Sequence, residues 1–383
     1  MNNVRAILEY AYQVAESGDN THSELSGPQQ RWVETIVEKA ESQKAVLAVL
    51  ITSLTKKIET PTQDVRYHKT ELPNGYSGRS FDTSYVTPFI AEKFQRFAMK
   101  SGSGWLTRSL EQAHPYTLTY PGRILNKTVR EAFLQILHDI EENQTAPKKY
   151  LYAIFAALIN LMEKATGQLG LWEKSDEGSA QIPQSDTITI DNIVNLLNYH
   201  FSFNYRVAGA SRLPVLAVFS AYEVLMSIER YEGKMLSPLK SHTTSDTKSG
   251  GIGDIEVLDE NEDFFEAVEI KHNIPISPDL VQGAYQKFAE TSASRYYLLT
   301  TAEPNVDDPK TVDQLVRKIH RQHGCEVIVN GIIPSLKYYL RLLSNPKLFL
   351  DRYSKNLKLD FKQSTDIKEI HLRYWNELLE SQL

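Results

Sequence analysis

The spacing of apolar residues changes along the chain, and this change limits the possible folds more than any other feature. Up to about residue 184, apolar residues recur at intervals of three and four, which is typical of amphipathic helices. From residue 254 onward, helical segments are interspersed with segments that alternate apolar and polar residues, as half-buried strands do. We therefore predict an α/β (α+β) protein, with a largely helical N-terminal half followed by a mixed β-sheet core flanked by helices.

Two regions are predicted. A polar stretch with Gly and Pro at residues 173–185 is the candidate boundary, which divides the chain into residues 1–184 and 185–383. The first region is predicted to contain helices at residues 4–15, 29–57, 86–99, 127–142 and 148–166. The second is predicted to contain helices at residues 188–199, 214–231, 278–289, 311–323 and 335–344, and strands at residues 254–258, 264–271, 296–301 and 326–330. The first two strands flank an acidic turn and indicate an antiparallel hairpin.

Composition limits where the protein works. The longest apolar run, at residues 150–162, is too short to cross a bilayer. Near the N-terminus, Glu9 precedes any apolar core of signal-peptide length. The single cysteine, Cys325, cannot close an intrachain disulfide and makes a cysteine-based zinc site implausible. We expect a cytoplasmic protein without membrane association.

The charge balance bears on possible partners. The net charge of -6, from 42 basic and 48 acidic side chains, does not by itself indicate a nucleic-acid-binding protein. Net charge averages over the whole surface, however, so a cleft can be basic within an acidic protein. Metal-binding carboxylates also add negative charge. The charge balance alone therefore leaves nucleic acid open as a partner.

Three polar residues of the predicted hairpin form the candidate catalytic group. Strand alternation places Glu269 and Lys271 on one face, while Ile270 between them points to the other. Asp254 begins the preceding strand, so a second carboxylate can lie beside this pair. Two carboxylates at one point repel each other unless a cation lies between them, and oxygen ligands suit Mg²⁺. We therefore expect Mg²⁺ bound by Asp254, Glu269 and the backbone carbonyl of Ile270.

The ammonium group of Lys271 would assist the chemistry of this site. It can orient or deprotonate an attacking water molecule, or it can stabilise charge on a pentacovalent phosphorus. The sequence leaves these roles open. Asp254, Glu269 and Lys271 are the predicted catalytic residues.

The same residues carry a resemblance to a known family. Residues 253–257 read Gly-Asp-Ile-Glu-Val and residues 266–271 read Glu-Ala-Val-Glu-Ile-Lys, which resembles the PD-(D/E)xK nuclease signature with Gly253 in place of Pro. The helical half before such a core is similar to type II restriction endonucleases, and the later strand and helix favour the SacI-like branch. The resemblance implies a restriction-endonuclease-like core at residues 185–383 and a DNA-recognition and dimerisation region at residues 1–184.

The resemblance also implies the activity and the partners. Type II restriction endonucleases use Mg²⁺ to hydrolyse phosphodiester bonds of double-stranded DNA at a specific short sequence. A homodimer that cuts a palindrome is implied, because two-fold protein symmetry matches two-fold DNA. A cognate DNA methyltransferase is expected as the genetic partner, because the host DNA would otherwise be cut.

Several side chains outside the signature are suited to contact DNA. Arginine reads guanine well and asparagine or glutamine reads adenine, while cations also bind phosphate. The candidates in loops and near a helix end are Asn74, Arg79, Lys100, Arg108, Lys318 and Arg321. The resemblance adds Gln282 and Gln286, because a Gln or Tyr on the helix after the signature often contributes to the site in these nucleases. Loops without a ligand, or a helix C-terminus that favours cations, explain the first group as well.

Simpler interpretations of these acidic residues remain open. Asp254 can be a turn residue, with Glu269 and Lys271 on a solvated strand face. Glu223 is either a further acidic residue near the metal or the polar face of its helix. We interpret Glu256 and Glu266 mainly as structural, and His272 as turned away from Lys271. Two other functions also remain, namely a structure-specific repair or junction nuclease with the same core and a non-catalytic DNA-binding protein.

Overall fold

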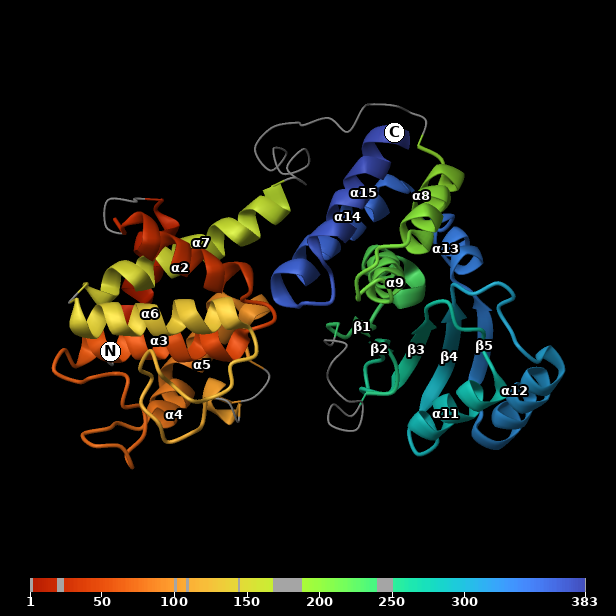
Figure 1. The fold of residues 1–383 in the computed structure, drawn as a ribbon. Coiled ribbons are helices and arrows are strands. Elements are labelled where there is room, and N and C mark those ends of the chain that lie inside the picture. The colour runs from red at the N-terminus through yellow and green to blue at the C-terminus, as the bar shows by residue number, and fades with distance from the viewer. Residues whose placement is uncertain are drawn as a thin grey trace. The chain divides into compact units, whose positions relative to one another are not determined.

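The chain forms two compact units, Met1–Ala165 and Thr166–Leu383 (Figure 1). The computed structural model describes residues 3–18, 24–99, 102–107, 110–143, 145–167, 188–239 and 251–382. The predicted α/β class, with a helical N-terminal half followed by a mixed sheet core, is confirmed. The predicted boundary at residues 173–185 lies outside the described residues. Within the described ranges, no helix combines the length and apolar character needed to cross a membrane.

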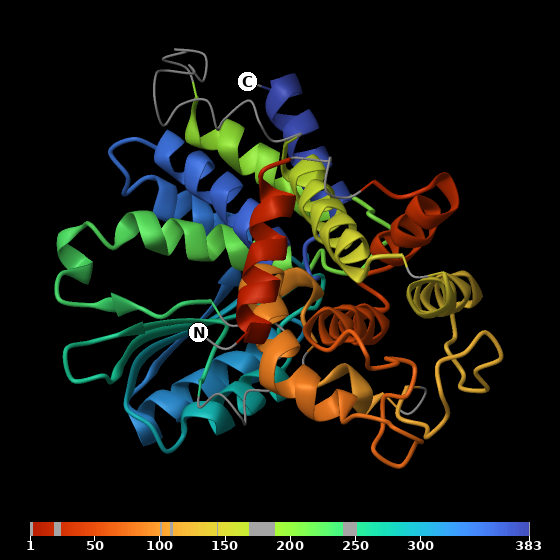
Figure 2. The ribbon, with the colours of Figure 1, turned by 90° about the vertical axis from the view of Figure 1, so that its left-hand side faces the viewer.

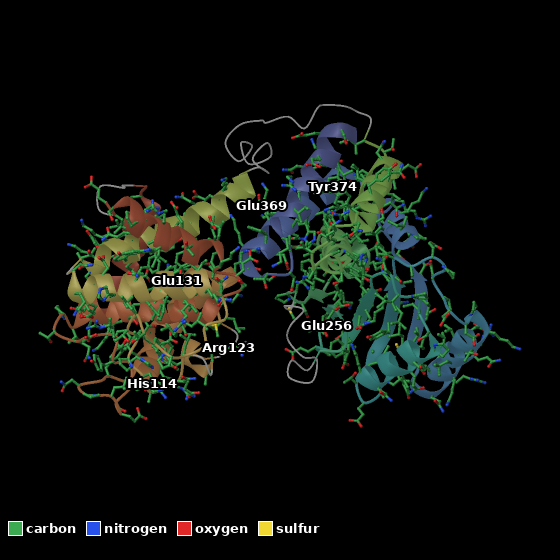
Figure 3. The ribbon with its side chains drawn as sticks, viewed as in Figure 1. His114, Arg123, Glu131, Glu256, Glu369 and Tyr374 are labelled. Carbon is green, nitrogen blue, oxygen red and sulfur yellow. The ribbon has the colours of Figure 1, made fainter. Side chains whose placement is uncertain are left out.

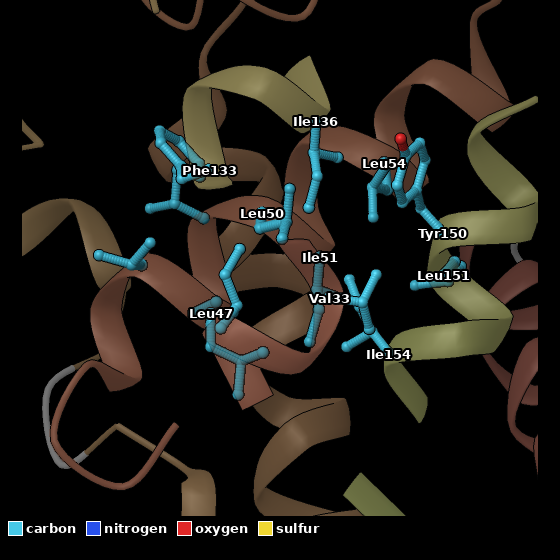
Figure 4. Close-up of a cluster of buried hydrophobic side chains, with 14 of the residues drawn as sticks. Val33, Leu47, Leu50, Ile51, Leu54, Phe133, Ile136, Tyr150, Leu151 and Ile154 are labelled. Carbon is cyan, nitrogen blue, oxygen red and sulfur yellow. The ribbon is translucent and has the colours of Figure 1, made fainter. Parts of the chain in front are cut away.

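The described part of the N-terminal unit is helical. Its elements are α1 (Asn3–Glu16), α2 (Gly27–Glu38), α3 (Lys44–Glu59), α4 (Gly78–Phe81), η2 (Asp82–Val86), α5 (Thr87–Lys93), η3 (Gln95–Phe97), η4 (Gly104–Leu106), α6 (Lys127–Glu142) and α7 (Pro147–Gly167). Helix α3 is apolar around most of its circumference, and every residue from Val46 to Thr55 is buried. It therefore forms the centre of the core of this unit, where Leu47, Leu50 and Leu54 face side chains of the other helices (Figure 4).

The predicted helix at residues 29–57 is wrong as one element, because α2 ends at Glu38 and α3 begins at Lys44. The amide of Lys39 donates to the carbonyl of Ile36, and the amide of Ala40 donates to that of Val37. These bonds span three residues and tighten the end of α2. Residues 39–43 then form a turn, so the two helices pack as separate elements.

The C-terminal unit contains a five-stranded sheet in the order β1-β2-β3-β4-β5. The strands are β1 (Met235–Leu236), β2 (Ile255–Leu258), β3 (Phe264–Lys271), β4 (Ala293–Thr300) and β5 (Glu326–Gly331). The pairs β1–β2 and β2–β3 are antiparallel, whereas β3–β4 and β4–β5 are parallel. The predicted hairpin is therefore present as β2 and β3, and β3 is the central strand between an antiparallel and a parallel neighbour.

Helices cover both faces of this sheet. The helices of this unit are α8 (Ile190–Ser202), α9 (Arg212–Leu225), η6 (Glu229–Tyr231), α11 (Pro278–Phe288), α12 (Pro309–His323), α13 (Ile332–Leu340), α14 (Lys347–Gln363) and α15 (Glu369–Gln382). Helices α11 and α12 pack on one face through a core that includes Ala284, Phe288 and Ile319. Helices α9 and α13 pack on the other face, where Tyr222 and Tyr339 lie (Figure 2).

Local signals fix the ends of α11 and α12. The Ser277 hydroxyl accepts a hydrogen bond from the amide of Leu280 at 3.3 Å, and a proline follows Ser277 at the first position of α11. The Asp308 carboxylate likewise accepts from the amide of Thr311 at 3.1 Å. Helix α12 ends at Gly324, whose φ of 87° lies in the left-handed region. These caps set where each helix starts and stops against the sheet.

Replacement of Leu50 by Ala should destabilise the N-terminal unit by about 2–5 kcal/mol, because it removes buried methyl groups from a packed core and leaves a cavity. Leu125, which is 75% exposed, is the matched control, and Leu125→Ala should change stability by less than about 0.5 kcal/mol. Urea denaturation followed by near-ultraviolet circular dichroism measures both. Equal effects of the two substitutions would contradict the packing described for α3.

Buried His200 on α8 makes the stability of the C-terminal unit depend on pH. Its Nδ1 lies 2.9 Å from the Tyr353 hydroxyl, and its Nε2 lies 3.0 Å from the carbonyl of His371. Burial lowers the pKa of His200 from 6.5 to about 3. Below the ordinary pKa, the unfolded chain binds a proton that the folded one does not. Stability is therefore lost as the pH falls toward the lowered value.

From about pH 6 to about pH 4, His200 alone should cost roughly 1.4 kcal/mol of unfolding free energy per pH unit. His200→Gln keeps a donor and an acceptor but does not titrate. The slope of its unfolding free energy against pH should therefore be smaller than that of the wild type by this amount. Urea denaturation across this pH range measures the two slopes. Parallel slopes for the two proteins would show that His200 is already protonated in the folded state.

Candidate active site

The register of β2 against β3 brings Asp254 next to Glu269. Ile255 pairs with Val268 in this antiparallel pair, so one further step along each strand places Asp254 opposite Glu269. The Asp254 amide donates to the Val268 carbonyl at 2.8 Å, and the Asp254 carboxylate accepts from the Ile270 amide at 2.8 Å. Backbone and side chain of Asp254 are therefore both fixed against the central strand.

Glu269 lies between two lysine ammonium groups. One of its carboxylate oxygens accepts from Lys271 Nζ at 2.6 Å, and the other accepts from Lys287 Nζ at 3.0 Å. Glu269 is only 8% exposed, so these charged bonds offset much of the cost of burying its carboxylate. The structure thus brings the three predicted catalytic residues together around positions 269–271 of β3.

Lys287 on α11 is the contact that the sequence did not reveal. The buried residues of α11 are Val281, Ala284 and Phe288, and Lys287 borders this apolar stripe at the side toward Glu269. A lysine at the margin of an apolar stripe can extend its stem along the buried surface and place its ammonium at a distant polar group. That position is the only signal in the sequence, and many surface lysines share it.

The loop before β2 is held from three sides. The carboxylate of buried Glu256, a residue of β2, accepts from the amides of Ile252 at 2.6 Å and of Gly253 at 3.3 Å (Figure 3). The Tyr296 hydroxyl donates to the Ile252 carbonyl at 2.6 Å. A Cβ added to Gly253 would lie 2.9 Å from the Val268 carbonyl oxygen. Glycine at this position therefore permits the close approach that sets Asp254 against β3.

The oxygen donors around β3 fit a hard divalent cation. Asp254 and Glu269 supply carboxylates. A third oxygen is the backbone carbonyl of Ile270, the residue between Glu269 and Lys271 in the sequence. Among the described residues, His, Cys, Asp and Glu form no group of three that could hold a metal ion. An all-oxygen set with remaining positions for water and phosphate suits Mg²⁺.

The opposite face of β3 carries a second buried carboxylate with different partners. Glu266 is fully buried and accepts hydrogen bonds from the hydroxyls of Tyr222 and Tyr231, each at 3.0 Å. Arg230 forms an ion pair with the same carboxylate, and the Tyr297 hydroxyl on β4 donates to it at 3.5 Å. Glu266 thus joins α9 and η6 to the sheet, and Glu256 holds the loop before β2, which agrees with structural roles for both.

Two other polar residues considered above have contacts away from Asp254. Glu223 on α9 accepts from Asn356 and lies 3.4 Å from Arg352, both on α14. It lines a cavity of about 550 Å³ with residues of α9 and α14. His272 directly follows β3, and its Nδ1 lies 3.0 Å from the Thr301 hydroxyl. The contacts of Glu223 thus join α9 to α14, and that of His272 joins the end of β3 to the residue after β4.

The predicted DNA-contacting residues of the N-terminal unit lie partly in described loops. Arg79 is exposed, and its guanidinium lies 3.5 Å from the carboxylate of Glu111. Asn74 is exposed with a positive φ of 54°, and its carbonyl accepts from the Gln63 side chain at 2.9 Å. Lys100 and Arg108 lie outside the described residues.

The predicted DNA-contacting residues of the C-terminal unit are on two helices. Gln282 and Gln286 lie four residues apart on the exposed side of α11, and Lys318 and Arg321 are exposed on α12. All four side chains therefore lie on the exposed surface of the C-terminal unit.

Comparison with protein-family models and with curated proteins gives no match to this chain. The resemblance based on residues 253–257 and 266–271 therefore stays a prediction. The proposals below depend on the contacts of the site itself.

Replacement of Glu256 by Ala should cost about 1–3 kcal/mol of unfolding free energy, because it leaves the amides of Ile252 and Gly253 without this acceptor. The matched control is Glu260→Ala in the exposed turn between β2 and β3, which should change stability by less than about 0.5 kcal/mol. Thermal and urea unfolding measure both. A stability for Glu256→Ala equal to that of the control would show that Glu256 does not hold the loop.

Proposed function

We propose that the protein is a Mg²⁺-dependent endonuclease that hydrolyses phosphodiester bonds of double-stranded DNA, in the manner of a type II restriction endonuclease. The observation that carries this proposal is the position of the Asp254 carboxylate on β3 beside the Glu269–Lys271 pair. Two carboxylates, a carbonyl and an ammonium group at one end of a central strand provide the groups that metal-dependent phosphodiester hydrolysis needs. The order of the residues along the chain follows the PD-(D/E)xK pattern.

Asp254, Glu269 and the Ile270 carbonyl would hold the metal ion. When bound, Mg²⁺ would lower the pKa of a water molecule, polarise the scissile phosphate and offset charge on the leaving oxygen. The chain's own contribution is to keep these ligands in place. The Ile270 amide fixes the Asp254 carboxylate, and the strand backbone fixes the carbonyl, so few side-chain torsions remain to be ordered when substrate binds.

Lys271 supplies the cation that acts on the substrate. Its ammonium group donates to Glu269 at 2.6 Å, and an ammonium has three donors in all. The donors not used on Glu269 can orient the attacking water or contact a phosphate oxygen. The Lys271 side chain is 26% exposed, so its ammonium lies at the border between the buried carboxylate and solvent. Substrate can therefore reach it.

The remaining parts of the proposal concern recognition and setting. We propose a cytoplasmic homodimer that recognises a short palindrome through loops of the N-terminal unit, with Arg79 and Asn74 as base-reading candidates. Exposed Lys318 and Arg321 on α12 would bind phosphates. The ion pair of Arg79 with Glu111 is exposed on both sides, so it costs little to exchange for a contact with DNA. A DNA methyltransferase would protect the host DNA.

Incubation of the purified protein with a panel of plasmid and viral DNA tests the activity, with Mg²⁺ and with a chelator. Discrete fragments that require Mg²⁺ are expected. A smear, or cleavage of branched DNA alone, would indicate a repair or junction nuclease and contradict sequence-specific cleavage. DNA binding without any cleavage would leave a non-catalytic DNA-binding protein and would contradict the proposal.

Asp254→Asn and Lys271→Met should each lower the cleavage rate by roughly a hundredfold or more while DNA affinity is kept. The first removes a charged metal ligand, and the second removes the ammonium group that faces substrate. Matched controls are Asp307→Asn and Lys310→Met, which change exposed side chains and should cleave like the wild type. Fragment release on gels gives the rates, and filter binding gives the affinities. Wild-type cleavage by Asp254→Asn would remove the site assignment.

A further inference from the structure

One carboxylate of the candidate site is shared by two ammonium groups from different elements. Lys271 reaches Glu269 along the same strand, and Lys287 reaches it from α11, with N–O distances of 2.6 and 3.0 Å. The side chain of Glu269 is 10% exposed, and those of the two lysines are 26% and 28% exposed. A single ammonium would neutralise one carboxylate, and two ammonium groups at one carboxylate repel each other. The presence of Lys287 beside Lys271 at this carboxylate therefore needs an explanation.

The formal charges of the site supply one. Asp254 and Glu269 carry two negative charges, and Lys271 and Lys287 carry two positive charges, so the group is neutral without a metal ion. A divalent cation on the two carboxylates would leave an excess of two positive charges. Two phosphodiester groups, each with one negative charge, would restore neutrality. The site thus has cations for the scissile phosphate and for one neighbouring phosphate.

We propose that Lys287 is a second phosphate-binding residue, which pairs with Glu269 until a divalent cation displaces it and then binds a phosphate next to the scissile one. This inference rests on the proposed endonuclease function. Lys287, rather than Lys271, is the group that moves, because Lys271 is fixed two residues from Glu269 on the same strand. Lys287 belongs to another element and reaches the carboxylate only through its flexible stem.

The surface of α11 is open one helical turn from Lys287. Gly283 lies one helical turn before Lys287, and a Cβ added at Gly283 would meet no atom within 4 Å. Gln282 and Gln286 are exposed on the same helix and add hydrogen-bond donors at this surface. A phosphate at this place would exchange the contact of Lys287 with Glu269 for a contact with another oxyanion, so the ammonium stays paired in both states.

A titration with Mg²⁺ alone tests the exchange without DNA. Lys287→Met keeps most of the apolar stem and removes the competing cation, so its Mg²⁺ dissociation constant should be lower than that of the wild type by roughly tenfold. Lys310→Met removes an exposed lysine of α12 and should bind Mg²⁺ like the wild type. Isothermal titration calorimetry measures the three constants. Unchanged or weaker Mg²⁺ binding by Lys287→Met would overturn the exchange.

Duplex binding at several salt concentrations tests the phosphate contact. Ca²⁺ replaces Mg²⁺ in this experiment, because it takes the same oxygen ligands, and the recovered DNA is checked to be uncut. Loss of one phosphate contact should reduce the slope of log affinity against log salt by about 0.9 in Lys287→Met. Lys287→Arg keeps the charge and should keep the wild-type slope. Equal slopes for Lys287→Met and the wild type would overturn the phosphate contact.

Two further measurements separate the possible failures. Melting temperatures of Lys287→Met and Lys287→Arg within the range of Lys310→Met show that the variants are folded. Wild-type protein that cleaves DNA, together with an unchanged salt slope for Lys287→Met, overturns the role of Lys287 and keeps the endonuclease. Wild-type protein that neither binds nor cleaves DNA overturns both.

Discussion

The hydrogen bond from the Ile270 amide to the Asp254 carboxylate is the constraint on which the candidate site depends. Asp254 precedes a strand of only four residues, β2, and follows a loop. The Asp254 amide donates to the Val268 carbonyl and fixes the backbone against β3. The bond from Ile270 fixes the carboxylate against the same strand, which has hydrogen-bonded neighbours on both sides. The central strand of the sheet therefore fixes where the groups of the site lie. Gly253 permits this arrangement because it has no side chain to collide with the Val268 carbonyl.

The buried carboxylates on the two faces of β3 have different kinds of hydrogen-bond partners. Glu266 receives three tyrosine hydroxyls and one guanidinium and has no exposed surface, so these partners link α9 and η6 firmly to the sheet. Glu269 receives only ammonium groups on flexible stems, near solvent. Tyrosines packed in a core cannot leave without opening it, whereas lysines can turn away at little cost. The face of Glu269 is therefore the one on which a carboxylate can change partners.

Strand alternation is the reason that the sequence predicted the strands β2 to β5 and the proximity of Asp254, Glu269 and Lys271. A period of two fixes which side chains share a face, and the predicted strand at residues 264–271 coincides with β3. The contact of Lys287 with Glu269 was not predicted, because periodicity places Lys287 at the margin of the apolar stripe of α11 but does not show which group its long side chain reaches. The break between α2 and α3 escaped because residues 39–43 are ordinary helix formers, and the turn depends on packing. Helices α14 and α15 also had no prediction, although Phe349 and Trp375 are fully buried there.

In the proposed activity, the two units of the chain have different tasks, namely base recognition and hydrolysis. The candidate site is built from carboxylates, ammonium groups and backbone, which would act on phosphate and do not distinguish one base from another. Side chains that can read bases belong to the N-terminal unit, with Asn74 in a loop and Arg79 in the short helix α4 that follows it. Backbone bonds from Tyr76 to Tyr67 and from Gly78 to His68 hold this loop in shape. A braced loop presents such groups with less loss of conformational entropy than a loose one. Sequence specificity would then arise from the helical unit, and hydrolysis from the sheet unit.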